Sequence, residues 1–373
     1  RPLNDLEVQL SDIAAGILGH ADFGLTTNLL RAGLTSLSCI KLAALIDESL
    51  GVSVAVRDIM KTPTLLGIEN AVISLLLTRK TAVKQAREKQ ERYPLSQSQM
   101  GIYLDCQKDP GSIRYNVPFM VSLPADIDAQ KLCDAVCAVI DAHPAVKARV
   151  ADGAQIPVGS PASLSFERMS EPAFHALSKR FVQPFDLAKG PLYRAVVTKT
   201  PERVSLLADF HHIAFDGGSL DLFLRELGAV YGGAKPADEK LSAFDAALEE
   251  TEREGSEGWL ADKAYFDERL KGFEGASEIT PDIGQDGSKG ALREIVQKAD
   301  REAVLAFCGS TGVTPAALFL AAAAYAVGRW TQKADVYLSG ISSGRGDTRL
   351  LNTFGMFVRT LPLAIRRDKG QSC

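Results

Sequence analysis

Two adjacent histidines, His211 and His212, follow an apolar, β-rich segment and are themselves followed by Asp216-Gly217. Successive residues of a strand point to opposite faces, so one ring would be structural while the other faces a cleft. An imidazole exchanges protons near neutral pH, and it could accept a proton from an amine or position that amine for attack on a thioester. The alternative is a pair of strand-end histidines whose ring nitrogens are satisfied in the core.

Other chemistries for this histidine pair lack the residues that they would need. A zinc site would require a third ligand in register, and the sequence offers none. No Gly-x-Ser-x-Gly segment accompanies the pair to form a nucleophilic triad. Cys133 and Cys137, two of the six cysteines, would share one helix face as small apolar side chains. We therefore expect no bound metal.

A second candidate is Ser36, in the segment Gly33-Leu34-Thr35-Ser36-Leu37, where a glycine turn precedes a predicted helix. One interpretation is that this serine is simply the residue that caps the helix. The same place also suits a phosphodiester, because the N-terminal amides and the dipole of a helix favour an anion. These five residues alone leave both interpretations open.

The elements that position Ser36 are short helices. Apolar spacing predicts helices over residues 3–18 and 36–50 and a last helix that Thr62-Pro63 opens, so we expect a small all-α bundle of four helices over residues 1–77. A basic stretch follows, with six Lys or Arg and two Glu between residues 79 and 92. It has no apolar face, and we interpret residues 78–92 as a linker.

The elements that position the histidines alternate between strands and helices. Strands are predicted over residues 115–121, 193–198 and 204–210, the last two as a hairpin, with helices over 128–141 and from 219. A run rich in Gly, Pro and Asp between residues 280 and 290 then separates a second α/β unit. We expect a multidomain chain whose α/β part has lobes over residues 93–275 and 276–373.

Composition restricts the classes of partner. A formal net charge of −4 over 373 residues gives no basic footprint for a nucleic acid. No stretch approaches the roughly 18 apolar residues of a membrane-spanning helix. With 46% apolar and 24% charged residues, the chain has ordinary globular composition. We expect a cytoplasmic protein that binds neither nucleic acid nor membrane.

The region around Ser36 resembles the acyl/peptidyl carrier protein family. The resemblance covers nearly all of residues 1–77, and Thr35 stands where that family most often has Asp. It is carried by Asn28-Leu29-Leu30-Arg31-Ala32-Gly33-Leu34-Thr35-Ser36-Leu37, Lys41-Leu42, Gly51-Val52 and Asp58-Ile59-Met60. It implies that 4′-phosphopantetheine is attached covalently to Ser36 by a phosphopantetheinyl transferase, and that its thiol carries an aminoacyl or peptidyl thioester.

The histidine segment, read as His211-His212-x3-Asp216-Gly217, resembles the HHxxxDG signature of nonribosomal peptide synthetase condensation domains. These domains belong to the chloramphenicol-acetyltransferase-like superfamily, which implies a two-lobed α/β fold over residues 93–373. Flanking segments agree in order and spacing: Tyr93-Pro94-Leu95-Ser96 with Gln99, Pro184-Phe185-Asp186-Leu187, Gly190-Pro191-Leu192-Tyr193-Arg194, Phe244-Asp245-Ala246, Ser343-Gly344-Arg345, Gly355-Met356-Phe357-Val358 and Thr360-Leu361-Pro362-Leu363.

The resemblance implies a role for each residue of the signature. His212, rather than His211, would orient or deprotonate the acceptor α-amine as it attacks the donor thioester. Asp216 would form a structural salt bridge that shapes the loop, with Lys147 in the place of the family's usual arginine. Lys lacks the bidentate fork of Arg, so this pair should be looser. Gly217 would let the backbone approach the substrate closely.

Taken together, the resemblances imply part of a nonribosomal peptide synthetase, in which a carrier presents a donor to the condensation domain that follows it. Its partners would be an upstream adenylation domain and a downstream carrier bearing the acceptor aminoacyl thioester. Family members continue past the segment at 361–363, so we expect the second lobe to be incomplete. Alternatives are a carrier and docking fragment without activity, or an epimerising or ester-forming relative with the same signature.

Overall fold

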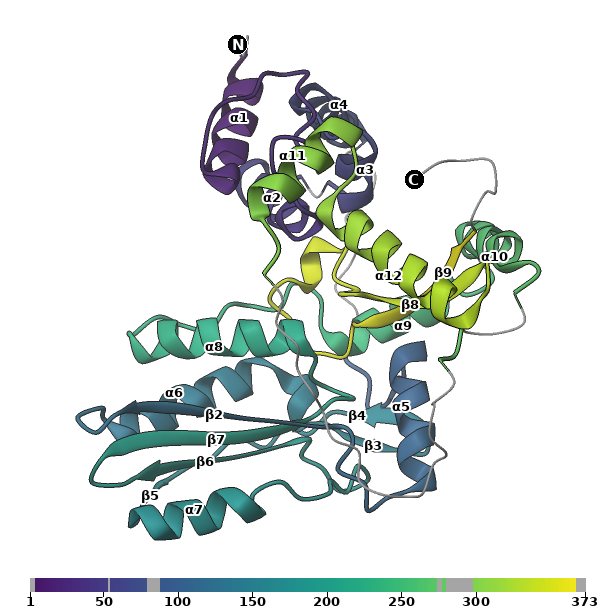
Figure 1. Ribbon diagram of the computed structural model, residues 1–373. Helices are drawn as coiled ribbons and strands as arrows, with labels where there is room; N and C mark the ends of the chain where they lie inside the picture. The colour runs from purple at the N-terminus through teal and green to yellow at the C-terminus, as the bar shows by residue number, and fades with distance from the viewer. Residues whose placement is uncertain (1–3, 53, 79–87, 274–276, 280–297, 367–373) are drawn as a thin grey trace. The chain divides into compact units, whose positions relative to one another are not determined.

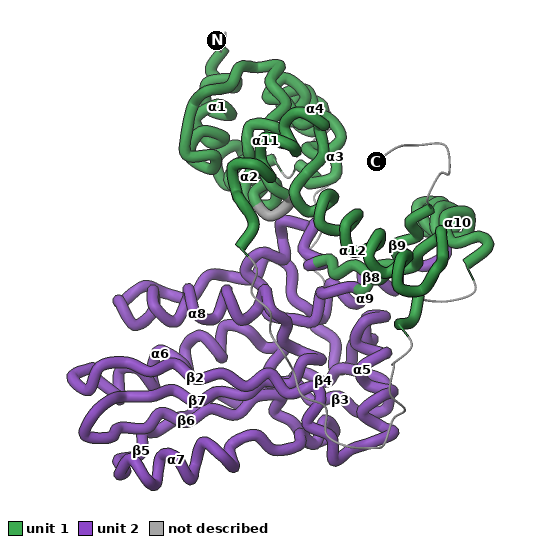
Figure 2. Tube along the Cα trace, in the orientation of Figure 1, with its two compact units in different colours: residues 1–79, 257–342, 360–373 green, residues 80–256, 343–359 purple. Residues whose placement is uncertain are grey.

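The computed structural model describes residues 4–52, 54–78, 88–273, 277–279 and 298–366 (Figure 1). The chain divides into two compact units (Figure 2). Unit 1 comprises residues 1–79, 257–342 and 360–373, and unit 2 comprises residues 80–256 and 343–359. Each unit is described by itself below.

The N-terminal region of unit 1 is a bundle of helices, as predicted. Its elements are α1 (Asp5–Leu18), α2 (Ser36–Leu50), α3 (Val56–Lys61) and α4 (Leu65–Thr78). Asn4 caps α1 in a capping box with Glu7, and Gly19 ends the helix in the left-handed conformation, with φ of 76°. The apolar stripes of the helices meet in one core that contains Leu10, Ala14, Leu29, Cys39, Leu42, Ile46, Ile59, Ile68 and Val72.

Unit 2 is built on a four-stranded sheet of order β2-β7-β6-β5. The strands are β2 (Asn116–Pro124), β5 (Phe166–Arg168), β6 (Tyr193–Lys199) and β7 (Arg203–His211). The predicted hairpin is confirmed, because β6 and β7 pair antiparallel across the turn between them. β2 pairs antiparallel with the other edge of β7, and β5 lies parallel to β6.

Helices cover both faces of this sheet, so β7 is buried along almost its whole length. Helices α6 (Ala129–Ala142) and α8 (Gly217–Tyr231) pack on one face, and α7 (Glu171–Arg180) lies on the other (Figure 1). Every residue of β7 after Arg203 is buried. A strand covered on both faces reads as an apolar run instead of an alternating pattern. The last residue of this buried strand is His211.

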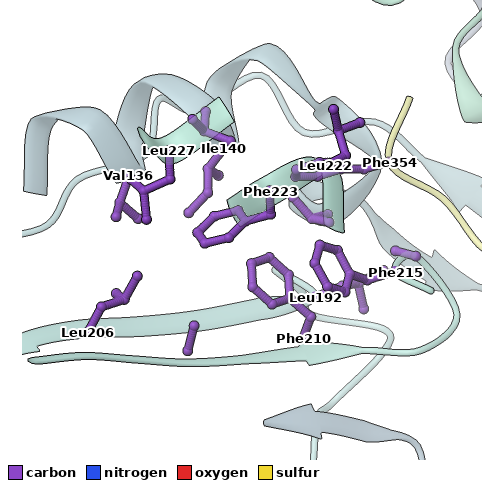
Figure 3. Packing of buried hydrophobic residues seen from close by; sticks show 14 of the residues in the cluster. Val136, Ile140, Leu192, Leu206, Phe210, Phe215, Leu222, Phe223, Leu227 and Phe354 are labelled. Carbon is purple, nitrogen blue, oxygen red and sulfur yellow. The ribbon is translucent and has the colours of Figure 1, made fainter. Parts of the chain in front are cut away.

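Aromatic rings fill the core between the sheet and α8 (Figure 3). The rings of Phe210 and Phe215 stack with centroids 4.0 Å apart, and Phe223 meets Phe210 edge-on at 5.6 Å. Phe354 meets Phe215 edge-on at 5.3 Å, although it comes from the distant segment 343–359. Truncating such a buried ring to Ala costs about 3–5 kcal/mol. Because Phe210 lies in β7 and Phe215 and Phe223 lie just before and within α8, the cluster holds both ends of the turn between β7 and α8.

The remaining elements of unit 2 lie beside the end of β7. A second sheet of order β1-β4-β3 supports α5 (Gln97–Lys108), whose capping box joins Ser96 and Gln99. The other elements are β1 (Tyr93–Pro94), η2 (Pro144–Lys147), β3 (Arg149–Ala151), β4 (Ala154–Ile156), α9 (Ala243–Arg253) and η3 (Thr348–Leu350).

Unit 1 also contains most of the elements that follow α9. They are α10 (Glu257–Leu270), α11 (Arg301–Thr311), α12 (Pro315–Thr331), β8 (Val336–Ser342) and β9 (Arg359–Ile365), and β8 pairs with β9. Within the described ranges, no single helix has the length and apolar composition to cross a membrane, whereas α11 and α12 meet these two criteria only as a pair, with a bend of 96°.

Two features of the structure are not specified by the sequence patterns. Within the charged stretch 249–271, Gly255 adopts a left-handed φ of 77° and separates α9 from α10. Helix α10 belongs to unit 1, whereas segment 343–359 returns to unit 2. Contacts made by residues more than 100 positions apart, such as Thr353 with Leu241, determine that return. Residues 79–87 of the predicted linker lie outside the described part of the chain.

Candidate functional site

The two adjacent histidines have different environments, as their position at a strand end predicts. His211 is the last residue of β7 and is 4% exposed. His212 begins the turn that follows, and this residue is partly exposed. The His212 backbone N–H donates to the carbonyl oxygen of Tyr115 at 2.8 Å, just before β2. A hydrogen bond to the segment just before β2 therefore fixes the backbone position of His212.

His211 is held as a neutral, structural imidazole. Its Nδ1 accepts the Ile213 N–H at 3.2 Å, so the ring hydrogen belongs on Nε2, which lies 3.7 Å from Cys106 Sγ. Burial, with the neighbouring charge of His212 as a smaller cause, lowers the pKa of His211 to about 4. At neutral pH the His211 ring therefore carries no charge.

The His212 ring has an unsatisfied group where His211 has none. Its Nδ1 is inaccessible to solvent and has no hydrogen-bond partner among the described residues. Buried polar atoms are rarely left without a partner, and such atoms concentrate at functional sites. Of the two histidines, His212 is therefore the one whose Nδ1 has no partner among the described residues.

Asp216 fixes the far end of the same turn. It is fully buried and caps α8 through Oδ1, which accepts from the backbone N–H of Ser219 at 2.8 Å. The same oxygen accepts from Arg345 Nη2 at 2.8 Å, and Oδ2 accepts from the Phe357 N–H at 3.0 Å. Both carboxylate oxygens are thus committed to structure. Asp216 forms the predicted salt bridge, but with a different partner.

The assignment of Lys147 as the partner of Asp216 is wrong. Lys147 lies at the end of η2, and its Nζ instead contacts Asp141 Oδ1 at 2.7 Å. The partner of Asp216 is Arg345, 129 residues further along the chain. A residue that must satisfy Asp216 together with several backbone carbonyls needs more donors than an ammonium offers in a fixed geometry.

Arg345 meets that need by donating in four directions. Its Nη1 donates to the carbonyl oxygens of Leu350 and Thr353 at 2.7 and 2.8 Å, while Nη2 donates to Asp216 and to Ser219 Oγ at 2.8 and 2.9 Å. The guanidinium thereby attaches segment 343–359 to the start of α8. Sequence reasoning identified Arg345 only as part of a flanking motif.

The two glycines after Asp216 have different roles. A Cβ on Gly217 would meet no atom of the described residues within 4 Å, so the space beside it is open. A Cβ on Gly218 would lie 2.6 Å from Arg345 Nε. The glycine required by close packing is therefore Gly218, which the sequence motif did not single out. The expectation that Gly217 admits substrate stays a prediction.

Ser36 lies at the N-terminus of α2, and the alternative that it is the helix cap is wrong. The cap is Thr35, whose Oγ1 accepts the Ser38 N–H at 3.1 Å. Ser36 is the first helical residue, after Gly33 with φ of 111°, and the first turn of this 15-residue helix contains no acidic side chain. These features suit a phosphate ester, because the helix dipole favours an anion here and no carboxylate opposes it.

Comparison with protein families divides the chain into two matches. Residues 8–72 match the family described as a phosphopantetheine attachment site, and residues 89–373 match the condensation domain family. The cofactor of the first region is therefore phosphopantetheine, which this family carries covalently on a serine.

Curated relatives are peptide synthetases. Tyrocidine synthase 3 of Brevibacillus parabrevis is 25% identical over 386 residues, which cover 97% of this chain and 6% of that protein. Bacitracin synthase 1 of Bacillus licheniformis is 27% identical over 372 residues, which cover 97% of this chain and 7% of that protein. The chain thus spans a small part of the length of these relatives.

Solved structures share the fold of the larger region. The X-domain in its complex with OxyB from teicoplanin biosynthesis has a TM-score of 0.64 at 21% identity, covering 75% of this chain and 66% of that one. The first condensation domain of the CDA synthetase has a TM-score of 0.58 at 20% identity, covering 76% and 73%. These likenesses establish an α/β fold of the condensation type.

Proposed function

The chain belongs to the condensation domain family, and within it a phosphopantetheine attachment region precedes the condensation domain. From this premise we propose that the chain forms amide bonds between carrier-bound substrates. Ser36 bears the phosphopantetheine arm, which supplies the thiol that holds the donor aminoacyl or peptidyl group as a thioester. His212 acts on the acceptor amine. The acceptor is an aminoacyl thioester on a downstream carrier, and the donor amino acid comes from an upstream adenylation domain.

In the proposed reaction, the acceptor α-amine attacks the thioester carbonyl carbon. The new C–N bond forms, the C–S bond breaks, and the donor sulfur leaves as a thiolate. His212 orients the amine, accepts its proton and returns a proton to the departing sulfur, so the protein ends as it began. The acyl chain thereby moves to the acceptor arm.

The observation that supports this proposal most strongly is the contrast between the two histidines. Both ring nitrogens of His211 face fixed neighbours, and its pKa is lowered to about 4 by burial first and then by His212. His212 Nδ1 has no partner among the described residues, and the turn that carries it is anchored at Asp216. A rigid turn with one uncommitted imidazole is suited to repeated proton exchange at a fixed position.

A single-turnover assay tests the proposal. The chain is first loaded by a phosphopantetheinyl transferase with an aminoacyl pantetheine, then mixed with a separate aminoacyl carrier, and the acceptor carrier is examined by intact-protein mass spectrometry. We expect the mass of a dipeptidyl arm on the acceptor. An acceptor that keeps only its own aminoacyl group would refute amide formation, and an epimerising enzyme would change the donor's configuration without adding mass.

The same assay tests Ser36. Ser36→Ala should gain no mass from coenzyme A and the transferase, while the parent chain gains one arm. Ser38→Ala, two residues away in the same helix turn, should load normally because it keeps the Ser36 hydroxyl. Equal labelling of the parent chain and Ser36→Ala would refute the assignment.

The finer description of the chain is part of the proposal. We propose that residues 1–77 form the carrier, that residues 78–92 link it to the condensation domain, and that the latter has the two-lobed chloramphenicol-acetyltransferase-like arrangement. The β2-β7-β6-β5 sheet with its covering helices is the observation in favour of the first lobe, and α12 with the β8–β9 pair is the observation in favour of the second. Limited proteolysis should cleave first between residues 78 and 92.

A further inference from the structure

A buried glutamine, Gln99, contacts the turn after β7 and is hydrogen-bonded to a second buried glutamine, Gln155, although neither lies near the turn in sequence. Gln99, in the first turn of α5, is 4% exposed, and Gln155, in β4, is 3% exposed. The Gln99 Nε2 donates to the Ile213 carbonyl oxygen at 2.9 Å and to Gln155 Oε1 at 3.0 Å. Ile213 directly follows His212. A side chain of α5 therefore holds the peptide beside the proposed catalytic ring.

The orientation of both amides follows from their backbone partners. The Ser96 N–H can only donate, so the atom it meets at 3.0 Å must be the oxygen of Gln99. The carbonyls of Ile213 and Pro94 can only accept, so each must face an amide nitrogen, from Gln99 at 2.9 Å and from Gln155 at 2.8 Å. The pair is thus ordered in one direction, with every bond supporting the next.

Gln99 completes a set of anchors around His212. The His212 N–H is fixed by the Tyr115 carbonyl at 2.8 Å, and the Ile213 N–H is fixed by His211 Nδ1 at 3.2 Å. These two contacts do not provide a hydrogen-bond donor for the Ile213 carbonyl oxygen, and Gln99 supplies that donor. This carbonyl belongs to the peptide between Ile213 and Ala214, whose N–H donates to the His211 carbonyl oxygen at 3.0 Å. Without the bond from Gln99, the peptide would hold a buried, unpaired carbonyl and would be anchored from one side only.

We propose that Gln99 is a positioning residue for His212: it fixes the Ile213 peptide and thereby the direction of the His212 ring, whereas Gln155 supports only the fold. The proposal deepens the proposed function and rests on it for its kinetic consequence. Its geometric consequence, the environment of the His212 ring, can be measured without any turnover.

Gln155 provides a matched control, because Gln99→Leu and Gln155→Leu remove the same amide from equally buried positions and both break the bond between the two glutamines. Only Gln99→Leu removes the donor to Ile213. We expect Gln99→Leu to lower kcat for amide formation about 10–100-fold, the cost of a displacement of about 1 Å, with the acceptor KM unchanged. Gln155→Leu should stay within about threefold of wild type at a comparable loss of thermal stability.

A third variant separates positioning from capping. Gln99→Leu also loses the bond to the Ser96 N–H, which belongs to the capping box of α5. Ser96→Ala disturbs that box from its other side and leaves the Gln99–Ile213 bond in place. We expect Ser96→Ala to lower the melting temperature, because loss of a cap costs about 1 kcal/mol of stability, and to leave kcat close to that of wild type.

The second readout is the nuclear magnetic resonance signal of His212 in chains with labelled histidine, assigned by its loss in His212→Ala. The titration curve and ring shifts of His212 should change in Gln99→Leu and remain as in wild type in Gln155→Leu. If wild type makes no amide, the proposed function fails while this comparison still decides the role of Gln99. Equal shifts in both variants, or equal losses of kcat, would overturn the proposal.

If Gln99→Leu does not fold, Gln99→Glu replaces it. A carboxylate keeps the acceptor for Ser96 but faces the Ile213 carbonyl without a hydrogen, and only the protonated acid donates as the amide does. We expect the ratio of Gln99→Glu to wild-type activity, and the likeness of their His212 signals, to rise as pH falls from 8 to 6. A ratio and signals that do not change with pH would overturn the proposal.

Discussion

The two regions that carry chemistry in this chain are held in place over very different distances in sequence. The start of α2, which bears Ser36, is fixed by Thr35 and Ser38, three residues apart. The turn that bears His212 is fixed by Gln99 on Ile213, 114 residues away, and by Asp216 with the Phe357 N–H, 141 residues away. One site is local, and the other is assembled from the whole of unit 2.

This difference fits the role that we propose for each site. An attachment hydroxyl has to be presented to a modifying enzyme and then to carry its arm to other sites, so a capped helix end is sufficient. A proton exchange between an amine and a leaving sulfur needs an imidazole within a fraction of an ångström of its working position. Only packing and hydrogen bonds from several directions hold a turn that closely.

Removing a long-range anchor should therefore have the largest effect on stability. Arg345→Ala leaves the Asp216 carboxylate buried without its cation, which costs about 3–5 kcal/mol. Chemical denaturation of the condensation domain measures this loss. The control is Lys147→Met, which loses only the pair with the partly exposed Asp141 and should cost about 1 kcal/mol or less. Equal losses would contradict the pairing of Asp216 with Arg345.

A second long-range anchor should act with a dependence on pH. His143 is fully buried and stacks on Phe354, with Nε2 2.9 Å from Glu226 and Nδ1 2.8 Å from Glu239. Burial acts to lower the pKa of His143, but the hydrogen bonds to the two carboxylates outweigh it and raise the pKa above its ordinary value of 6.5. His143→Gln loses hydrogen bonds to charged groups, worth about 1.5–3 kcal/mol each.

The sign of the pH effect follows from the raised pKa of His143. The stabilisation is complete below the unfolded value near 6.5 and is lost as pH rises through the higher folded pKa. The difference in unfolding free energy between wild type and His143→Gln should therefore be larger at pH 6 than at pH 9. A difference that grows with pH would mean that His143 is neutral in the folded protein.

The local site should show the smallest and most confined effect. Thr35→Ala removes the cap of α2 and should lower the stability of the carrier by about 1 kcal/mol. The melting of the condensation domain should not change, and Ser36 should still accept its arm. If Thr35→Ala lowered amide formation by more than it lowers loading of Ser36, the expectation of a local effect would be contradicted.

The range of the contacts also explains what could be predicted from sequence. The hairpin of β6 and β7 and the helix predicted over residues 128–141 depend on patterns within a few residues, and both are confirmed. Hydrophobic periodicity and short-range capping rules are sufficient for such features.

The rest depended on residues that sequence does not bring together. Arg345 reaches Asp216 across 129 residues, whereas the predicted partner Lys147 bonds Asp141, six residues away. Segment 343–359 rejoins unit 2 only after the chain has passed through unit 1. Gln99 belongs to a segment that carries the family resemblance, but its contact with Ile213 could not be inferred from the motif, since the two residues lie 114 positions apart.

In the reaction that we propose, His212, and not its neighbour, exchanges the proton of the acceptor amine. Single-turnover amide formation, with donor loaded on Ser36 and acceptor on a separate carrier, tests it directly in wild type, His212→Ala and His211→Ala. We expect His212→Ala to slow the reaction about 10²–10⁴-fold, the usual contribution of a positioned acid–base group, and His211→Ala to slow it far less. A larger loss in His211→Ala than in His212→Ala would contradict the account.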